Sequence, residues 1–143
     1  VKLDQNTNGK YFFDFQNSES AKTDNITLVS DFLKAYFKYT ADGYTNIGAN
    51  YSNVMSYVLG GSSAAKVIGE SYNGVVWNST YRVTYNKLEI DNFVTYGETA
   101  FSCDVVYDTI FTCAGYEHPR VGAFKLVFVK SGNTFKLSKM LNR

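Results

Sequence analysis

The two halves of the chain differ in the spacing of their apolar residues. Within residues 26–37 the apolar side chains recur at intervals of three or four, which is the spacing of one face of an α-helix. From residue 81 onward apolar and polar residues largely alternate, which is the period of a β-strand. The pattern therefore predicts helices first and strands afterwards, an α+β chain.

Three helices are predicted in the first half. Residues 24–42 form the first, with Thr23 or Asp24 as the N-cap, because short polar side chains satisfy the free amides of a helix start. Residues 47–58 and 64–72 form the second and third. Each pattern is followed by glycine, which commonly ends helices.

Four strands are predicted behind the helices, at residues 81–90, 99–114, 121–130 and 134–141. In the first strand the alternation slips at Asn86 and Lys87, as a β-bulge would cause. Residues 115–120 are predicted to return the chain as a turn, and Gly132 lies in the turn of the closing hairpin. The result is a curved antiparallel meander.

Cys103 and Cys113 lie on one predicted strand, which argues against a disulfide between them. Ten residues of strand span about 33 Å, whereas bridged Cα atoms are within roughly 7 Å of each other. We expect two free thiols with a structural role. A reactive or metal-binding pair would need a nearby histidine or a closer spacing.

Length and charge narrow the classes further. With 143 residues, we expect one domain at residues 25–143, preceded by an extension at 1–24 whose residues 11–15 resemble a short edge strand or docking segment. The net charge is +1 and the basic residues are scattered, so nucleic acid is not an expected partner. Residues 43–65 lack charge but are interrupted by Gly, Asn and Ser, which argues against membrane insertion.

The order of helices and strands resembles the nuclear transport factor 2-like superfamily, the cystatin-like α+β roll. Residues 124–130 and 134–140 carry the likeness, which extends over about residues 25–141. Phe135 stands where many members carry Trp, and the segment at 11–15 is not required by the usual order. The resemblance implies three N-terminal helices packed on a curved sheet of four to five strands, a cone whose open end is a pocket in enzymes and ligand binders.

A second resemblance indicates where in the cell the protein acts. Residues 32–39, followed by Asp42 and Tyr44, look like extracytoplasmic domains of Gram-positive conjugation proteins related to type IV secretion components. In those proteins the module serves assembly. The chain begins at Val1 without a basic and apolar leader, so we expect a mature or trimmed form from an extracytoplasmic protein of a Gram-positive bacterium.

Two polar residues are candidates for catalysis. Asp104 lies between the apolar Cys103 and Val105, and in a closed cavity it would suit a general base, as a carboxylate does in ketosteroid isomerase-like members. His118 is the only histidine, and a dyad would need Asp104 or Asp91 beside it. The structural interpretations, a solvated strand aspartate and an exposed turn histidine, are favoured.

Aromatic side chains are candidates for lining a cavity for a flat apolar ligand, since tyrosine offers a ring and a hydroxyl. These are Tyr36, Tyr51, Trp77, Tyr81 and Tyr85. Packing in the core is the favoured alternative. No metal-ligand spacing and no phosphate-binding glycine loop is found in the sequence, so no metal or cofactor is predicted.

Three functional interpretations remain open at this stage. The first is a non-enzymatic extracytoplasmic binding or assembly module with a protein partner or a small apolar ligand. The second is an isomerase or dehydratase in which Asp104 is the base and a tyrosine hydroxyl stabilises a developing oxyanion. The third is a self-associating domain, because sheets of the resembled family often pair through their outer faces.

Overall fold

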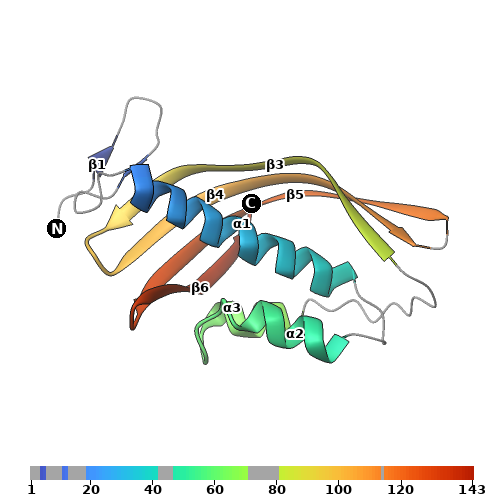
Figure 1. Ribbon diagram of the computed structural model, residues 1–143, viewed down its shortest axis with the longest axis horizontal. Helices are drawn as coiled ribbons and strands as arrows, with labels where there is room; N and C mark the ends of the chain where they lie inside the picture. Colours follow the sequence, from blue (N-terminus) through green and yellow to red (C-terminus); the bar gives the residue numbers. More distant parts are fainter. Residues whose placement is uncertain (1–3, 6–10, 13–18, 42–46, 71–80, 114) are drawn as a thin grey trace.

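The computed structural model describes residues 4–5, 11–12, 19–41, 47–70, 81–113 and 115–143 (Figure 1). Its helices are α1 (Glu19–Ala41), α2 (Ile47–Met55) and α3 (Ser63–Glu70). Its strands are β1 (Asp4–Gln5), β2 (Tyr11–Phe12), β3 (Tyr81–Tyr96), β4 (Ala100–Cys113), β5 (Tyr116–Ser131) and β6 (Thr134–Asn142). The α+β prediction, with three helices before a four-stranded sheet, is confirmed.

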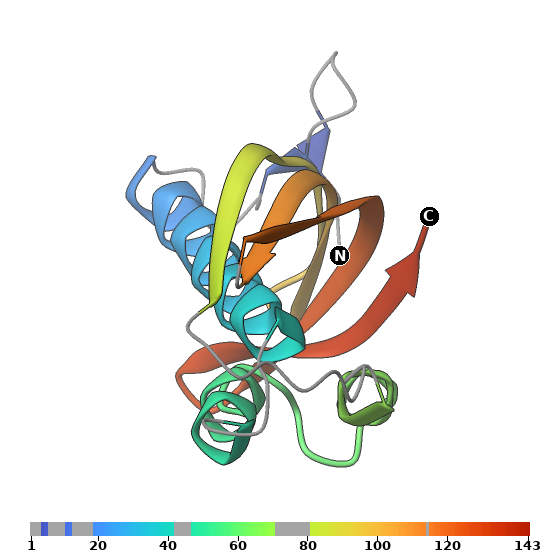
Figure 2. The ribbon, with the colours of Figure 1, turned by 90° about the vertical axis from the view of Figure 1, so that its right-hand side faces the viewer.

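The main sheet has the strand order β3-β4-β5-β6, and every neighbouring pair is antiparallel. Figure 2 shows the sheet curving around α1 on its inner side, with α2 and α3 near β6. We call the side that holds the helices the concave face and the opposite side the outer face. β1 and β2 pair with each other as a separate small sheet, and β2 lies within the segment 11–15 that was expected as an edge strand or docking segment.

Four boundaries differ from the prediction by three residues or more. β3 continues to Tyr96, past the predicted end at residue 90. α1 begins at Glu19, before the predicted cap, because Glu, Ala and Lys favour a helix even where no amphipathic pattern is visible. α2 ends at Met55, because the following residues pair with β6. β5 begins at Tyr116, so residues 116–120 are strand and not turn. Pro119 fits there because β6 pairs with β5 only from Phe124 onward, which leaves this part of β5 as an edge.

Bulges bend β3. The register shifts between Tyr85 and Lys87, as predicted, and again between Asp91 and Val94. Asn92 in the second shift has a φ of 56°, the left-handed region in which Asn is among the few residue types tolerated. Each bulge adds curvature to the strand, and this curvature lets the sheet wrap the helices.

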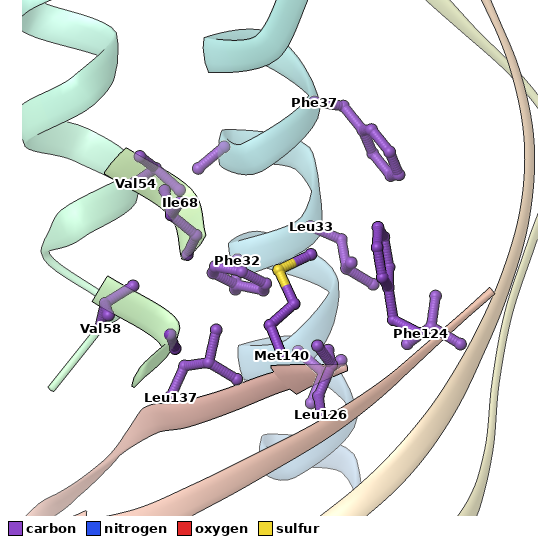
Figure 3. Packing of buried hydrophobic residues seen from close by; sticks show 14 of the residues in the cluster. Phe32, Leu33, Phe37, Val54, Val58, Ile68, Phe124, Leu126, Leu137 and Met140 are labelled. Atoms are coloured by element: carbon purple, nitrogen blue, oxygen red, sulfur yellow. The ribbon is translucent and has the colours of Figure 1, made fainter. Parts of the chain in front are cut away.

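The core lies between the helices and the concave face (Figure 3). Phe101 stacks on Phe128 with 5.0 Å between ring centroids, and Phe32 of α1 meets Phe128 edge-on at 6.2 Å. Cys103 is buried on this face as a free thiol, while the Cys113 side chain lies outside the described residues. The Phe101 and Val105 side of β4 is therefore the helix-packing side, a choice that alternation alone leaves open.

The free edge of β6 is covered by the chain after α2. The Leu137 amide donates to the Tyr57 carbonyl at 2.8 Å, and the Leu59 amide donates to the Leu137 carbonyl at 2.9 Å. Unpaired edge strands invite association with other chains. This short parallel contact satisfies the backbone groups of β6 around Leu137, so this part of the edge is not free to pair with another chain.

Candidate functional site

The end of the concave face where α1 terminates carries side chains from three strands. The register aligns Tyr85, Thr109 and Arg120 in one row, and Val83, Phe111 and His118 in the next. Side chains two residues apart on a strand share a face. Arg120 and His118 therefore project to the same side as the core aromatics, beyond the part of the sheet that the helices fill.

Three of these residues, together with Tyr107 on the same side of β4, surround Phe37 of α1 or lie just outside it. We call Tyr85, Tyr107, Phe111 and Arg120 the Arg120 cluster. The Phe37 ring lies 6.0 Å from Tyr85, 4.9 Å from Tyr107 and 6.4 Å from Phe111, between centroids. The Arg120 guanidinium carbon lies over the Phe111 ring, 5.5 Å from its centroid. The cluster thus combines an aromatic base with one cation, a cation–π arrangement.

Both tyrosines of the cluster remain protonated at neutral pH. Burial raises the pKa of Tyr85. Burial also raises the pKa of Tyr107, and the nearby Arg120 charge offsets only part of that rise. Both hydroxyls can therefore donate hydrogen bonds.

The predicted aromatic candidates do not form one group. Tyr36 packs between Phe37 and Phe124, at 5.5 and 5.7 Å between ring centroids, so it belongs to the margin of the core. Tyr51 instead lies against Tyr39, at 5.5 Å, and is 39% exposed on α2. Trp77 and the Tyr81 side chain lie outside the described residues.

The two catalytic candidates lie on opposite faces of the sheet. His118 pairs in register with Phe111, seven residues along β4 from Asp104. Asp104 and Asp91 pair with each other at the other end of the sheet. His118 is exposed, as predicted, but it lies within β5. The geometry therefore brings neither aspartate to the histidine.

Asp104 has structural partners on the outer face. The Arg143 Nη1 atom lies 2.7 Å from Asp104 Oδ2, and Asn92 Nδ2 donates to the same oxygen at 3.0 Å. The Asp104 side chain is 19% exposed. The carboxylate thus joins the second bulge of β3 to the last residue of the chain.

The outer face presents apolar side chains to solvent. Val106 is 38%, Val121 69% and Leu141 49% exposed, and alternation places all three opposite the core side. In both ribbon views the three helices lie on the other side of the sheet (Figures 1 and 2). This face is a candidate interaction surface.

Among the residues the structure describes, no three His, Cys, Asp or Glu side chains are grouped so as to hold a metal ion. Within those residues, too, no helix has the length and apolar character needed to cross a membrane.

Sequence reasoning missed Arg120 and Tyr107 as site residues. For Arg120 the reason is the assignment of residues 115–120 to a turn, which removed any expectation about the direction of their side chains. The apolar pattern gave no signal for it, because Pro119, Val121 and Ala123 are out of phase with the apolar residues from Phe124 onward. Only the register with β4 places Arg120 on the concave face.

Comparison with known proteins supports the fold. No protein-family model matches the chain, and no curated protein matches it significantly. A solved structure described as an "Ntf2 like protein involved in plasmid conjugation" aligns with 100% of this chain at 14% identity and a TM-score of 0.50. The alignment covers 45% of that protein, so this chain spans less than half its length. The chain has the nuclear transport factor 2-like fold.

Proposed function

We propose that the chain is a non-enzymatic assembly module that acts outside the cytoplasmic membrane and binds a second copy of itself through the outer face of its sheet. The similar structure is described as an Ntf2-like protein involved in plasmid conjugation. We extend that setting to this chain as part of the proposal. The outer face carries the argument.

The centre of the outer face is open and largely apolar, with Asp108 as the charged residue of β4 between its apolar positions. Val106 pairs in register with Ala123, and Ile110 pairs with Pro119 four residues further along β4. Val121 lies between these pairs on β5 and is 69% exposed. Contiguous apolar surface of this kind on a sheet marks an interaction site more often than a solvated face.

The charges on the two halves of the outer face differ in sign around the Asp104 row. There the β3 and β4 half carries the acidic residues Glu89, Asp91 and Asp104, whereas the β5 and β6 half carries the basic residues Lys125, Lys139 and Arg143. The basic residues Arg82 and Lys87 lie further along the β3 half, and within one copy Lys87 pairs with Glu89 and Arg143 with Asp104. Consider two copies that pack outer face to outer face around a two-fold axis parallel to the strands and above the boundary between β4 and β5. The β3 and β4 half of each copy would then face the β5 and β6 half of the other. The same surface would then meet itself with opposite charges facing, as an isologous dimer requires.

The geometry supports binding over catalysis. An isomerase or dehydratase would need Asp104 beside a tyrosine hydroxyl of the concave face. Asp104 instead lies on the outer face and is paired with Arg143, while Tyr85 and Tyr107 pack on the concave side against Phe37.

Sedimentation velocity over a range of concentrations tests the proposal. Wild-type protein is expected to sediment as a dimer at the upper end of the range. Val106→Asp places a charge at the apolar centre and should raise the dimer dissociation constant at least about tenfold, equivalent to ~1.4 kcal/mol. The matched control is Val67→Asp on α3, because Val67 is 42% exposed and Val106 38%.

Two outcomes would contradict the proposal. Wild-type protein that remains monomeric at every concentration excludes the dimer. An equal rise in the dimer dissociation constant for Val67→Asp and Val106→Asp would show that the interface is not specific to the outer face. Circular dichroism spectra of both variants establish that each is folded before the comparison is made.

A further inference from the structure

The Arg120 side chain has no acidic partner in the described part of the chain. Its guanidinium contacts the Phe111 ring, and its backbone carbonyl accepts a hydrogen bond from Thr109 Oγ1 at 2.8 Å. Neighbouring positions on the concave face of the three strands are Val83, Tyr85, Tyr107, Phe111, His118 and Gly122. None of these is a carboxylate, and the last turn of α1 adds the basic Lys38.

The stacking on Phe111 orients Arg120 without using its hydrogen-bond donors. A guanidinium lying over an aromatic ring is attracted through its flat face, so the N–H groups around its rim stay free. Those donors match the two oxygens of a carboxylate in a bidentate pair. The bond from Thr109 to the Arg120 carbonyl helps to fix the strand from which the side chain projects.

The surroundings of Arg120 favour a carboxylate attached to an apolar body. Tyr107 offers a hydroxyl donor close enough to Arg120 to be influenced by its charge, and Tyr85 lies in the same row of the sheet as Arg120. The Phe111 and Phe37 rings beneath are buried, at 4% and 2% exposed, so an aromatic or aliphatic group on the ligand would lie against the partly exposed Tyr85 and Tyr107 rings. That contact would exclude water from the ion pair between the carboxylate and Arg120, which strengthens the pair.

We propose that the Arg120 cluster binds a carboxylate carried by an aromatic or apolar group, with Arg120 as the charged partner and the Tyr85 and Tyr107 hydroxyls as additional donors. The site is on the face opposite the proposed dimer surface. It does not depend on that dimer. The carboxylate can belong to a small organic acid or to the C-terminal residue of a polypeptide, since both present the same chemistry.

Nuclear magnetic resonance titration of the 15N-labelled chain tests this inference, with benzoate as the first probe and benzamide as its neutral counterpart. Benzoate should shift the amide signals of Arg120 and Gly122, and benzamide should bind at least about tenfold more weakly because the ion pair is lost. A tripeptide ending in phenylalanine, with a free or an amidated C-terminus, provides the second pair. Tighter binding of the free peptide than of benzoate would assign the polypeptide source, and the reverse would assign a small acid.

Variants identify the residue responsible. Arg120→Gln should weaken benzoate binding at least tenfold, Arg120→Lys should weaken it less, and Tyr107→Phe should weaken it severalfold. Arg82→Gln is the matched control, because Arg82 is an exposed arginine on the outer side of the same sheet. Equal binding of benzoate and benzamide, or unchanged binding by Arg120→Gln with the remaining amide spectrum intact, would overturn the proposal.

Discussion

Gly122 is required because the Tyr107 ring lies directly over it. A Cβ atom at position 122 would lie 2.6 Å from the Tyr107 hydroxyl oxygen and 2.9 Å from Cζ. The ring has little room to retreat, since it stacks on Phe124 at 5.0 Å and meets Phe37 at 4.9 Å, between centroids. A single missing methyl group therefore sets the position of one wall of the Arg120 cluster.

We expect Gly122→Ala to lower the free energy of unfolding by about 1–3 kcal/mol, the usual cost of overpacking. Urea unfolding followed by circular dichroism measures it. Gly48→Ala in α2 is the control, because a Cβ there meets no atom within 4 Å. It should stabilise the chain by ~0.5–1 kcal/mol through helix propensity. Equal effects of the two changes would show that Tyr107 does not confine position 122.

At the scale of elements, the second bulge gives β3 much of its bend. Asn92 there has a left-handed φ of 56° and also donates to Asp104. Two substitutions separate these roles. Asn92→Gly loses only the hydrogen bond, whereas Asn92→Ala loses the bond and also strains the backbone.

Asn92→Ala should therefore be less stable than Asn92→Gly by about 1 kcal/mol, the typical penalty for alanine in the left-handed region. This order is the reverse of the one in regular strands and helices, where the alanine variant is more stable than the glycine variant. Urea midpoints of the two variants give the comparison. Alanine at least as stable as glycine would mean that β3 does not hold this conformation in solution.

The elements also show which features of the fold could be read from sequence. The bulge at Tyr85 and Lys87 was predictable because the apolar alternation visibly changes phase there. The bulge near Asn92 was not, because Phe93 and Val94 are both apolar and hide the change. The pairing of Tyr57 and Leu59 with Leu137 joins distant residues through backbone groups alone, so no side-chain pattern could reveal it.

Prediction of the candidate site was similarly uneven. Tyr85 and His118 were recognised as unusual by their residue type, and both project from the concave side of the same end of the sheet. Asp104 was recognised too, but its face depends on which side of β4 receives the helices. That choice is made by the whole molecule, because local alternation is symmetrical with respect to the two faces.

At the scale of the whole molecule, one layer of sheet separates two surfaces of different chemistry. Among the described residues, the helices pack on the concave face up to the end that holds the Arg120 cluster, and the outer face carries the largely apolar centre around Val106. Consecutive residues of a strand point to opposite faces. Arg120 and Val121 are therefore neighbours in the chain that belong to different proposed sites.

This adjacency gives a stringent test of both proposals together. Val121→Asp should raise the dimer dissociation constant at least about tenfold while leaving the affinity for benzoate within about twofold. Arg120→Gln should weaken benzoate binding while leaving the dimer dissociation constant within about twofold. Sedimentation velocity and benzoate titration of the same two proteins measure the four values. If either change impaired both properties in folded protein, the two sites would be coupled through the sheet, and the separation of functions by face would be wrong.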